Sequence, residues 1–75
     1  MVGMARDICV RFGRRIRELR KERGWRQIDL AEQAGISENY VSDLELGRKE
    51  VCLRMIEALS GALGIDILGL MKGVQ

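Results

Sequence analysis

The sequence has no histidine, no proline and only two cysteines, Cys9 and Cys52, among its 75 residues. The lack of histidine excludes a Ser-His catalytic pair and an HExxH zinc site, and two separate thiols are too few for a four-ligand zinc centre. We therefore expect neither an enzyme nor a zinc or other metal site. Because no secretory signal is recognisable, we interpret the thiols as small hydrophobic residues in a reducing cytoplasm.

Aromatic residues and long apolar runs are also scarce. Three aromatic side chains argue against an aromatic-rich β-barrel, and no apolar run approaches the roughly 18 residues that a membrane-spanning helix needs. The 47% of hydrophobic residues suffices for one small core, and nine glycines fit short helices separated by turns. We expect one domain over residues 1–75, with a core over about 8–71 and frayed ends at 1–6 and 73–75. Both Met1 and Met4 are compatible with the native start.

The net charge of +2 is unevenly distributed along the chain. Residues 1–26 contain nine Arg and Lys residues against three acidic ones, whereas residues 27–75 contain four against eight. Such asymmetry indicates a polyanionic partner that approaches the molecule from one side. The alternative interpretation is a solvated helix whose charges have no partner.

Glycines at positions 24, 35, 47 and 64 each end a stretch of helical periodicity, which predicts five helices. The first helix is expected over about 8–23, with Asp7 as its N-cap. The second is expected over about 27–34. Its N-cap position holds Arg26, a poor capping residue, and Trp25 and Leu30 are placed to form a hydrophobic staple. The predicted inward faces of these two helices contain Phe12, Ile16, Leu19, Leu30, Ala31 and Ala34.

Three further helices are expected in the second half of the chain. Ser37 is predicted to cap a helix that ends near Leu46 and turns Val41 and Leu44 inward. Asp66 is predicted to cap a short last helix. Between them, a helix over about 52–63 is expected to bury one stripe of side chains, formed by Leu53, Ile56, Leu59 and Leu63.

The segment 27–45 consists of two predicted helices joined through Gly35, the one residue there that is free to make a sharp turn. Two helices joined by so short a turn cross at a steep angle, as in the helix-turn-helix motif. The alternative is a structural corner of an all-helical protein, because helical hairpins also occur without a binding role.

The residue types and spacings around this motif resemble the Cro/C1-type, or XRE-family, helix-turn-helix domains over residues 12–71. The resemblance implies a lambda repressor-like fold, a compact all-α five-helix bundle, that binds operator DNA as a homodimer without enzymatic activity or cofactor. It also implies a cytoplasmic protein that is nucleoid-associated when bound, and segment 40–45 resembles the small controller proteins of restriction-modification systems. The resemblance depends on Gly13, Ile16, Leu19, Arg20, Gln27, Leu30, Ala31, Gly35, Ser37, Val41, Leu44, Glu45, Gly47, Leu53, Leu63 and Gly64.

Four exposed positions of the recognition helix, expected over 38–46, are predicted to face the major groove. Asn39 has the amide needed for a bidentate contact to adenine. Glu38 or Asp43 can accept a hydrogen bond from a cytosine amino group. The predicted base-contacting residues are Glu38, Asn39, Ser42 and Asp43.

The recognition helix carries acidic residues but no Arg or Lys, so most of the attraction for DNA is expected from phosphate contacts elsewhere. Gln27, in the first turn of its helix, can meet a phosphate together with unpaired backbone N–H groups. For each arginine the alternative is a solvated surface charge, and for Tyr40 it is packing against the preceding helix. The predicted phosphate-contacting residues are Arg14, Arg17, Arg26, Gln27, Ser37, Tyr40, Arg48 and Lys49.

The last predicted helix is more apolar than its own core requires, since so short a helix cannot turn every apolar side chain inward. We expect part of it to be covered by a second copy of the chain. The alternative is that Leu68 is a lone exposed leucine. The predicted dimer-interface residues are Ile67, Leu68, Leu70 and Met71.

Together these patterns predict a sequence-specific double-stranded DNA-binding transcriptional regulator, a homodimer that reads a pseudo-palindromic operator through successive major grooves. No membrane contact and no small-molecule ligand are expected, so regulation would follow from dimer concentration and operator occupancy. The alternative is a protein-interaction module of the antitoxin type, which uses the same fold against a basic protein. The operator sequence, the regulated gene and the sign of regulation stay open.

Overall fold

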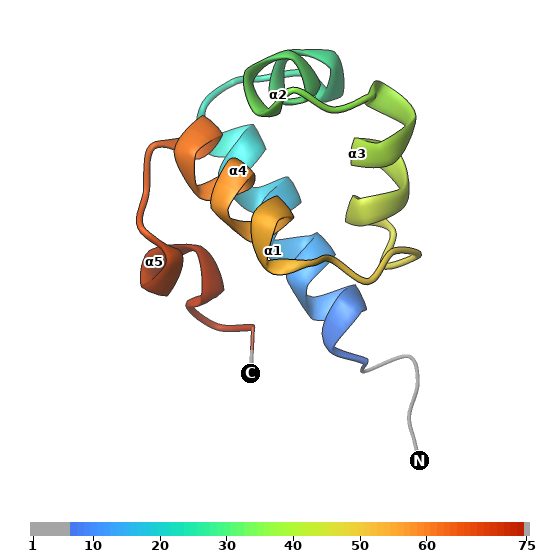
Figure 1. The fold of residues 1–75 in the computed structure, drawn as a ribbon, viewed down its shortest axis with the longest axis vertical. Helices are drawn as coiled ribbons and strands as arrows, with labels where there is room; N and C mark the ends of the chain where they lie inside the picture. Colours follow the sequence, from blue (N-terminus) through green and yellow to red (C-terminus); the bar gives the residue numbers. More distant parts are fainter. Residues whose placement is uncertain (1–6, 75) are drawn as a thin grey trace.

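The computed structural model describes residues 7–74, which form five α-helices and no β-strand. The all-α, five-helix fold predicted from the sequence is thereby confirmed. Figure 1 shows α3 and α5 on opposite sides of α1 and α4, with α2 across one end. Within residues 7–74, no helix has the length and apolar composition that crossing a membrane requires. The helices are α1 (Ile8–Glu22), α2 (Gln27–Ala34), α3 (Glu38–Glu45), α4 (Leu53–Leu63) and α5 (Ile67–Met71).

The helix starts are fixed largely by the side chains that the sequence predicted. Asp7, Ser37 and Asp66 each accept a hydrogen bond from a backbone N–H group of the first turn, at 2.7, 3.0 and 2.7 Å. The side chain of Arg26 cannot cap α2 in this way, because a guanidinium has no acceptor. Instead, the Asp29 carboxylate accepts a hydrogen bond from the Arg26 backbone N–H at 2.7 Å. This half of a capping box compensates for the poor N-cap residue.

The core combines apolar side chains from all five helices, most of them at predicted positions. The prediction for Leu53 is wrong, because its side chain is 83% exposed. At about 100° per residue, Leu53 lies roughly 80° and 120° around α4 from the buried Leu63 and Leu59, so the predicted stripe drifts out of the core at its N-terminal end. The core residues are Phe12, Ile16, Leu19, Leu30, Ala31, Val41, Leu44, Leu59, Leu63, Leu70 and Val74.

The C-terminal residues contribute to this core. Val74 is almost completely buried and its carbonyl oxygen accepts a hydrogen bond from Arg11 Nε, so the predicted fraying is wrong for residues 73 and 74. Leu70 is also buried in the core of its own chain. A second chain cannot reach it, and its assignment to a dimer interface is therefore wrong. Residues 1–6 and 75, including both candidate start residues Met1 and Met4, lie outside the described residues.

Gly13 allows α1 to approach α3 closely. A Cβ atom at this position would lie 2.3 Å from the carbonyl oxygen of Leu44 and 2.8 Å from that of Glu45. Both oxygens belong to the backbone of α3, which cannot move away without shifting the whole helix. Glycine is therefore required where the two helices meet.

We expect Gly13→Ala to lower the free energy of unfolding by about 1–3 kcal/mol, because the added methyl group overpacks this contact. Gly61→Ala is the matched control, since Gly61 lies within α4 and a Cβ there meets nothing within 4 Å. The control should raise stability by about 0.5–1 kcal/mol, as alanine does in helix interiors. Urea unfolding followed by circular dichroism measures both changes, and equal stabilities of the two variants would contradict the close approach.

Candidate nucleic-acid interface

The turn between α2 and α3 has the geometry that the glycine at its start predicts. Gly35 adopts the left-handed conformation, with φ 72° and ψ 33°, and its N–H donates to the carbonyl oxygen of Ala31. The N–H of Ile36 donates to the same oxygen at 3.0 Å. Side chains beyond glycine rarely adopt this φ, so Gly35 ends α2 and redirects the chain toward Ser37, which caps α3.

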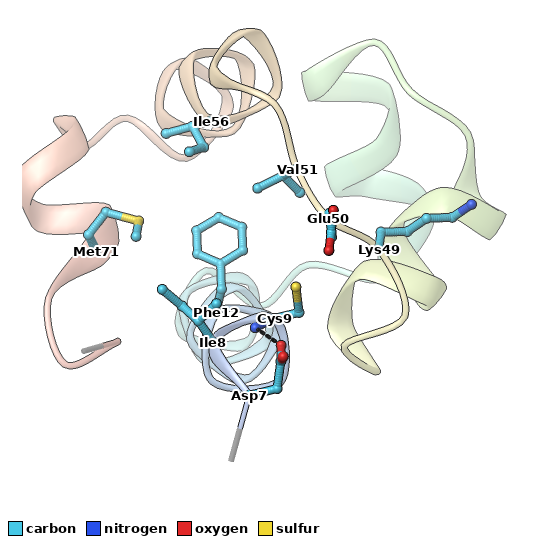
Figure 2. Close-up of a pocket in the computed structure, with 9 residues that line it drawn as sticks. All are labelled: Asp7, Ile8, Cys9, Phe12, Lys49, Glu50, Val51, Ile56 and Met71. Atoms are coloured by element: carbon cyan, nitrogen blue, oxygen red, sulfur yellow. Dashed lines mark hydrogen bonds between the residues drawn. The ribbon is translucent and has the colours of Figure 1, made fainter. Parts of the chain in front are cut away.

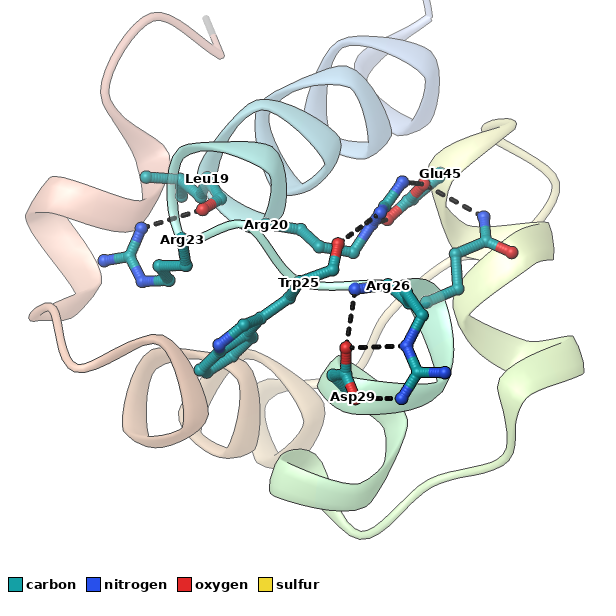
Figure 3. A network of polar contacts seen from close by, with 8 residues as sticks. Leu19, Arg20, Arg23, Trp25, Arg26, Asp29 and Glu45 are labelled. Atoms are coloured by element: carbon teal, nitrogen blue, oxygen red, sulfur yellow. Dashed lines mark hydrogen bonds and ion pairs between the residues drawn. The ribbon is translucent and has the colours of Figure 1, made fainter.

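A buried ion pair connects α1 to the C-terminal end of α3 (Figure 3). Arg20 donates through Nε and Nη2 to the two carboxylate oxygens of Glu45, at 2.6 and 3.0 Å. Its Nη1 atom donates to the carbonyl oxygen of Trp25 at 2.8 Å. The two side chains are only 10% and 4% exposed, so the pair is shielded from water. This bidentate geometry fixes the position of α3 relative to α1.

Gln27 joins the same network from the first turn of α2. Its Nε2 atom donates to Glu45 Oε1 at 3.1 Å. The carboxylate accepts hydrogen bonds only, which orients the Gln27 amide with its nitrogen toward Glu45. Sequence reasoning named Arg20 and Glu45 as family positions but assigned them no contact. Their opposite charges were the one signal that could have paired them.

The four predicted base-contacting residues all lie on α3, which also carries the buried Val41 and Leu44 on its inner face. Glu38 and Asn39 are exposed, whereas Ser42 and Asp43 are half-buried. The Asp43 carboxylate lies 3.7 Å from the guanidinium of Arg48, so a predicted base contact and a predicted phosphate contact form an ion pair.

Tyr40 and Lys49 are two further predicted phosphate contacts that the fold brings together. The Lys49 ammonium lies 5.8 Å from the centre of the Tyr40 ring, within the range of a cation–π interaction. Burial raises the pKa of the Tyr40 phenol, with a smaller contribution from Cys52. The phenol is therefore protonated near neutral pH and is able to donate a hydrogen bond.

Arg26, at the start of α2, is exposed but carries a carboxylate partner. Its Nε and Nη2 atoms donate to the Asp29 carboxylate at 3.2 and 3.0 Å. This contact with Arg26 holds the pKa of Asp29 below its ordinary value and raises the pKa of Arg26. Part of the positive charge predicted to meet a phosphate is thus balanced within the chain.

Arg15 of α1 and Arg23, the residue that follows α1, bind the C-terminal part of the fold. Arg23 donates to the carbonyl oxygen of Leu63, the last residue of α4, at 2.6 and 2.9 Å. Arg15 donates to the carbonyl oxygen of Gly69 in α5 at 2.9 Å. Cations favour the carbonyl-rich ends of helices, so these side chains stabilise the packing of α4 and α5.

Arg14 and Arg17, the two predicted phosphate contacts on α1, are both exposed. Arg14 lines a hollow between α1 and Lys72, beyond α5. Because α5 and α3 lie on opposite sides of α1 (Figure 1), this hollow lies apart from the predicted phosphate contacts at the ends of α2 and α3.

Comparison with known proteins agrees with this arrangement of helices. A family model described as helix-turn-helix matches residues 16–70. The HTH-type transcriptional regulator DdrOP3 of Deinococcus deserti is 46% identical over 61 residues, which are 81% of this chain and 47% of that protein. The control protein C.MunI of Mycoplasma sp is 34% identical over 70 residues, covering 92% of this chain and 95% of that protein.

A solved structure is similar over most of both chains. The restriction-modification controller protein C.AhdI from Aeromonas hydrophila superposes with a TM-score of 0.80 at 40% sequence identity, covering 83% of this chain and 94% of its own. The chain therefore spans about half the length of DdrOP3 but nearly the whole length of C.MunI and C.AhdI.

We expect Glu45→Gln to lower the free energy of unfolding by about 3–5 kcal/mol, because it leaves the buried Arg20 guanidinium without its counter-charge. For a chain of this size that is a large part of a total of about 4–11 kcal/mol. Glu22→Gln, the same change at an exposed position of α1, should stay within about 0.5 kcal/mol of wild type. Urea denaturation measures both, and equal unfolding midpoints would show that the pair contributes nothing.

Proposed function

The chain belongs to the helix-turn-helix family, and from that premise we propose that it binds double-stranded DNA sequence-specifically and regulates transcription. The observation that carries the proposal is the position of α3: its inner face and its C-terminal end are fixed in the core, while its outer face presents polar side chains. The names of DdrOP3, C.MunI and C.AhdI as regulators or controllers support the same function. Operator DNA as the partner supports the cytoplasmic location that we propose.

In this proposal α3 enters the major groove and reads base edges. The exposed Asn39 amide matches the donor and acceptor pattern of adenine, and the exposed Glu38 carboxylate accepts from the amino group of cytosine. Ser42 and Asp43 complete the outer face, and the pairing of Asp43 with Arg48 places a cation at the edge of the groove.

Phosphate contacts then come from the ends of α2 and α3. The N-terminus of α2 offers unpaired backbone N–H groups beside the oriented Gln27 amide, which suits a phosphate oxygen. The remaining proposed contacts around the groove are Arg17, Arg26, Ser37, Tyr40, Arg48 and Lys49.

An apolar face over α4 and α5 supports a homodimer. Leu53 and Leu68 are 83% and 84% exposed, and Ile67 is about half exposed. Leu53 and Ile67 line one hollow together with Ile56. Ile56 also lines a second hollow of about 280 Å³, in which the Phe12 ring faces Ile56 (Figure 2). Several large apolar side chains exposed close together favour association with another apolar surface. Arg54 and Glu57 also line the face, and such opposite charges can pair across a two-fold axis.

Selection of bound duplexes from a random pool tests the proposal directly. We expect enrichment of a pseudo-palindromic sequence whose half-sites are centred about 34 Å apart, as two linked recognition helices require. Failure to enrich any sequence, together with co-purification of a basic polypeptide, would instead support a protein-interaction module.

Asn39→Ala should cost roughly 1–3 kcal/mol on the selected site and relax the preference at one base pair, because a bidentate contact to a base is lost. Arg48→Ala is the comparison variant and should weaken binding to all duplexes alike, with a smaller salt dependence. Gel-shift titrations at several salt concentrations measure both. Unchanged base preference in Asn39→Ala would move the reading surface away from α3.

Leu68→Asp should shift the protein from dimer to monomer, because it places two like charges opposite each other in an apolar interface. Gln33→Glu adds the same charge on α2, outside this face, and should leave the dimer intact. Sedimentation velocity with circular dichroism on the same samples measures both. A Leu68→Asp variant that stays helical and dimeric would rule out this interface.

A further inference from the structure

A basic hollow lies between α1 and the residues that follow α5. Its volume is about 260 Å³, and Arg11, Arg14, Arg15 and Lys72 line it together with one carboxylate, that of Glu18. Four cations against one acid leave a strong excess of positive charge in a small concave space. A hollow of this kind attracts anions more strongly than an isolated surface arginine does.

The hollow is separate from the proposed DNA-binding surface. Gly13 and Arg20 lie on the side of α1 that meets α3. Arg11 and Arg15 each lie two residues from Gly13, which is about 200° around the helix. Lys72 follows α5, and α5 and α3 lie on opposite sides of α1 (Figure 1).

The arginines are held in place without being neutralised. Arg15 Nη2 donates to the carbonyl oxygen of Gly69, and Arg11 Nε donates to that of Val74. These partners carry no net charge, so both guanidiniums keep theirs. Arg15 Nε is buried and has no hydrogen-bond partner among residues 7–74. Like charges spaced three and four residues apart on a helix repel each other, and an anion would relieve that repulsion.

We propose that this hollow binds a small phosphate-containing anion. Guanidinium groups present paired N–H donors that match the oxygens of a phosphate, and the nearby lysine adds a point charge. The volume is below the roughly 300–1,000 Å³ of pockets for drug-sized ligands, which favours a compact anion such as a phosphate or diphosphate group. An anion bound to Arg14 and Lys72 bridges α1 to the chain after α5.

Thermal unfolding in the absence of DNA tests the site independently of the DNA-binding function. Inorganic pyrophosphate, compared with sodium chloride at equal ionic strength, should raise the unfolding midpoint. The expected rise is about 4–8 °C when its concentration is about five times the dissociation constant. Equal midpoints in the two salts would overturn the proposal, because only general screening would then act.

Variants locate the effect. Lys72→Gln and Arg14→Gln should each reduce the pyrophosphate shift by at least half, while Lys21→Gln, the same kind of change at an exposed position of α1 outside the hollow, should retain it. Retention in the first two variants would overturn the assignment.

Binding to a non-specific duplex distinguishes the source of the phosphate. If Lys72→Gln also lowers affinity for that duplex, the anion is the DNA backbone, and unchanged affinity assigns a free phosphate compound.

Discussion

The ion pair between Arg20 and Glu45 is the interaction on which the arrangement of the helices around the turn depends. Removing two charges from water costs several kcal/mol per ion, and good geometry with further hydrogen bonds must offset that cost. Here the guanidinium meets both carboxylate oxygens and the carbonyl of Trp25, and the carboxylate also accepts from Gln27. These contacts join α1, α2, α3 and the loop residue Trp25 at the same buried ion pair. The angle of α3 and the orientation of the Gln27 amide are thus set by the same buried charge.

The helix boundaries were predictable because the signals that set them act within one turn. Asp7, Ser37 and Asp66 cap the first turns that follow them, and Gly35 needs only its own backbone freedom to end α2. The helix-turn-helix arrangement followed from two such local signals placed close together. The roles of the base-contacting and phosphate-contacting residues remain predictions, because they depend on a partner as well as on this chain.

Whether an individual side chain is buried or exposed depends on which other element packs against it. The spacing of residues along one helix does not encode this. Leu53 and Leu70 both fit an apolar periodicity, yet one is exposed and the other is in the core. The basic segment 1–26 shows the same limit, because its sequence does not reveal which arginines are paired within the fold. Arg20 is paired with Glu45 and Arg26 with Asp29, so the charge count of the sequence overstates the positive charge available to a polyanion. Which arginines keep an unpaired charge depends on where the fold places carboxylates such as Glu45 and Asp29.

The acidic character of the recognition helix is reduced by the same tertiary contacts. Of the three acids on α3, Glu45 is neutralised by Arg20 in the interior, and Asp43 is paired with Arg48. Glu38 is the acid of α3 that has no ion-pair partner within residues 7–74, and it lies at the N-terminal end, where the helix dipole favours a negative charge. The helix that we propose for the groove looks repulsive to DNA in the sequence, but among residues 7–74 it presents one unpaired carboxylate. A single carboxylate can discriminate among bases through cytosine amino groups while adding little general repulsion.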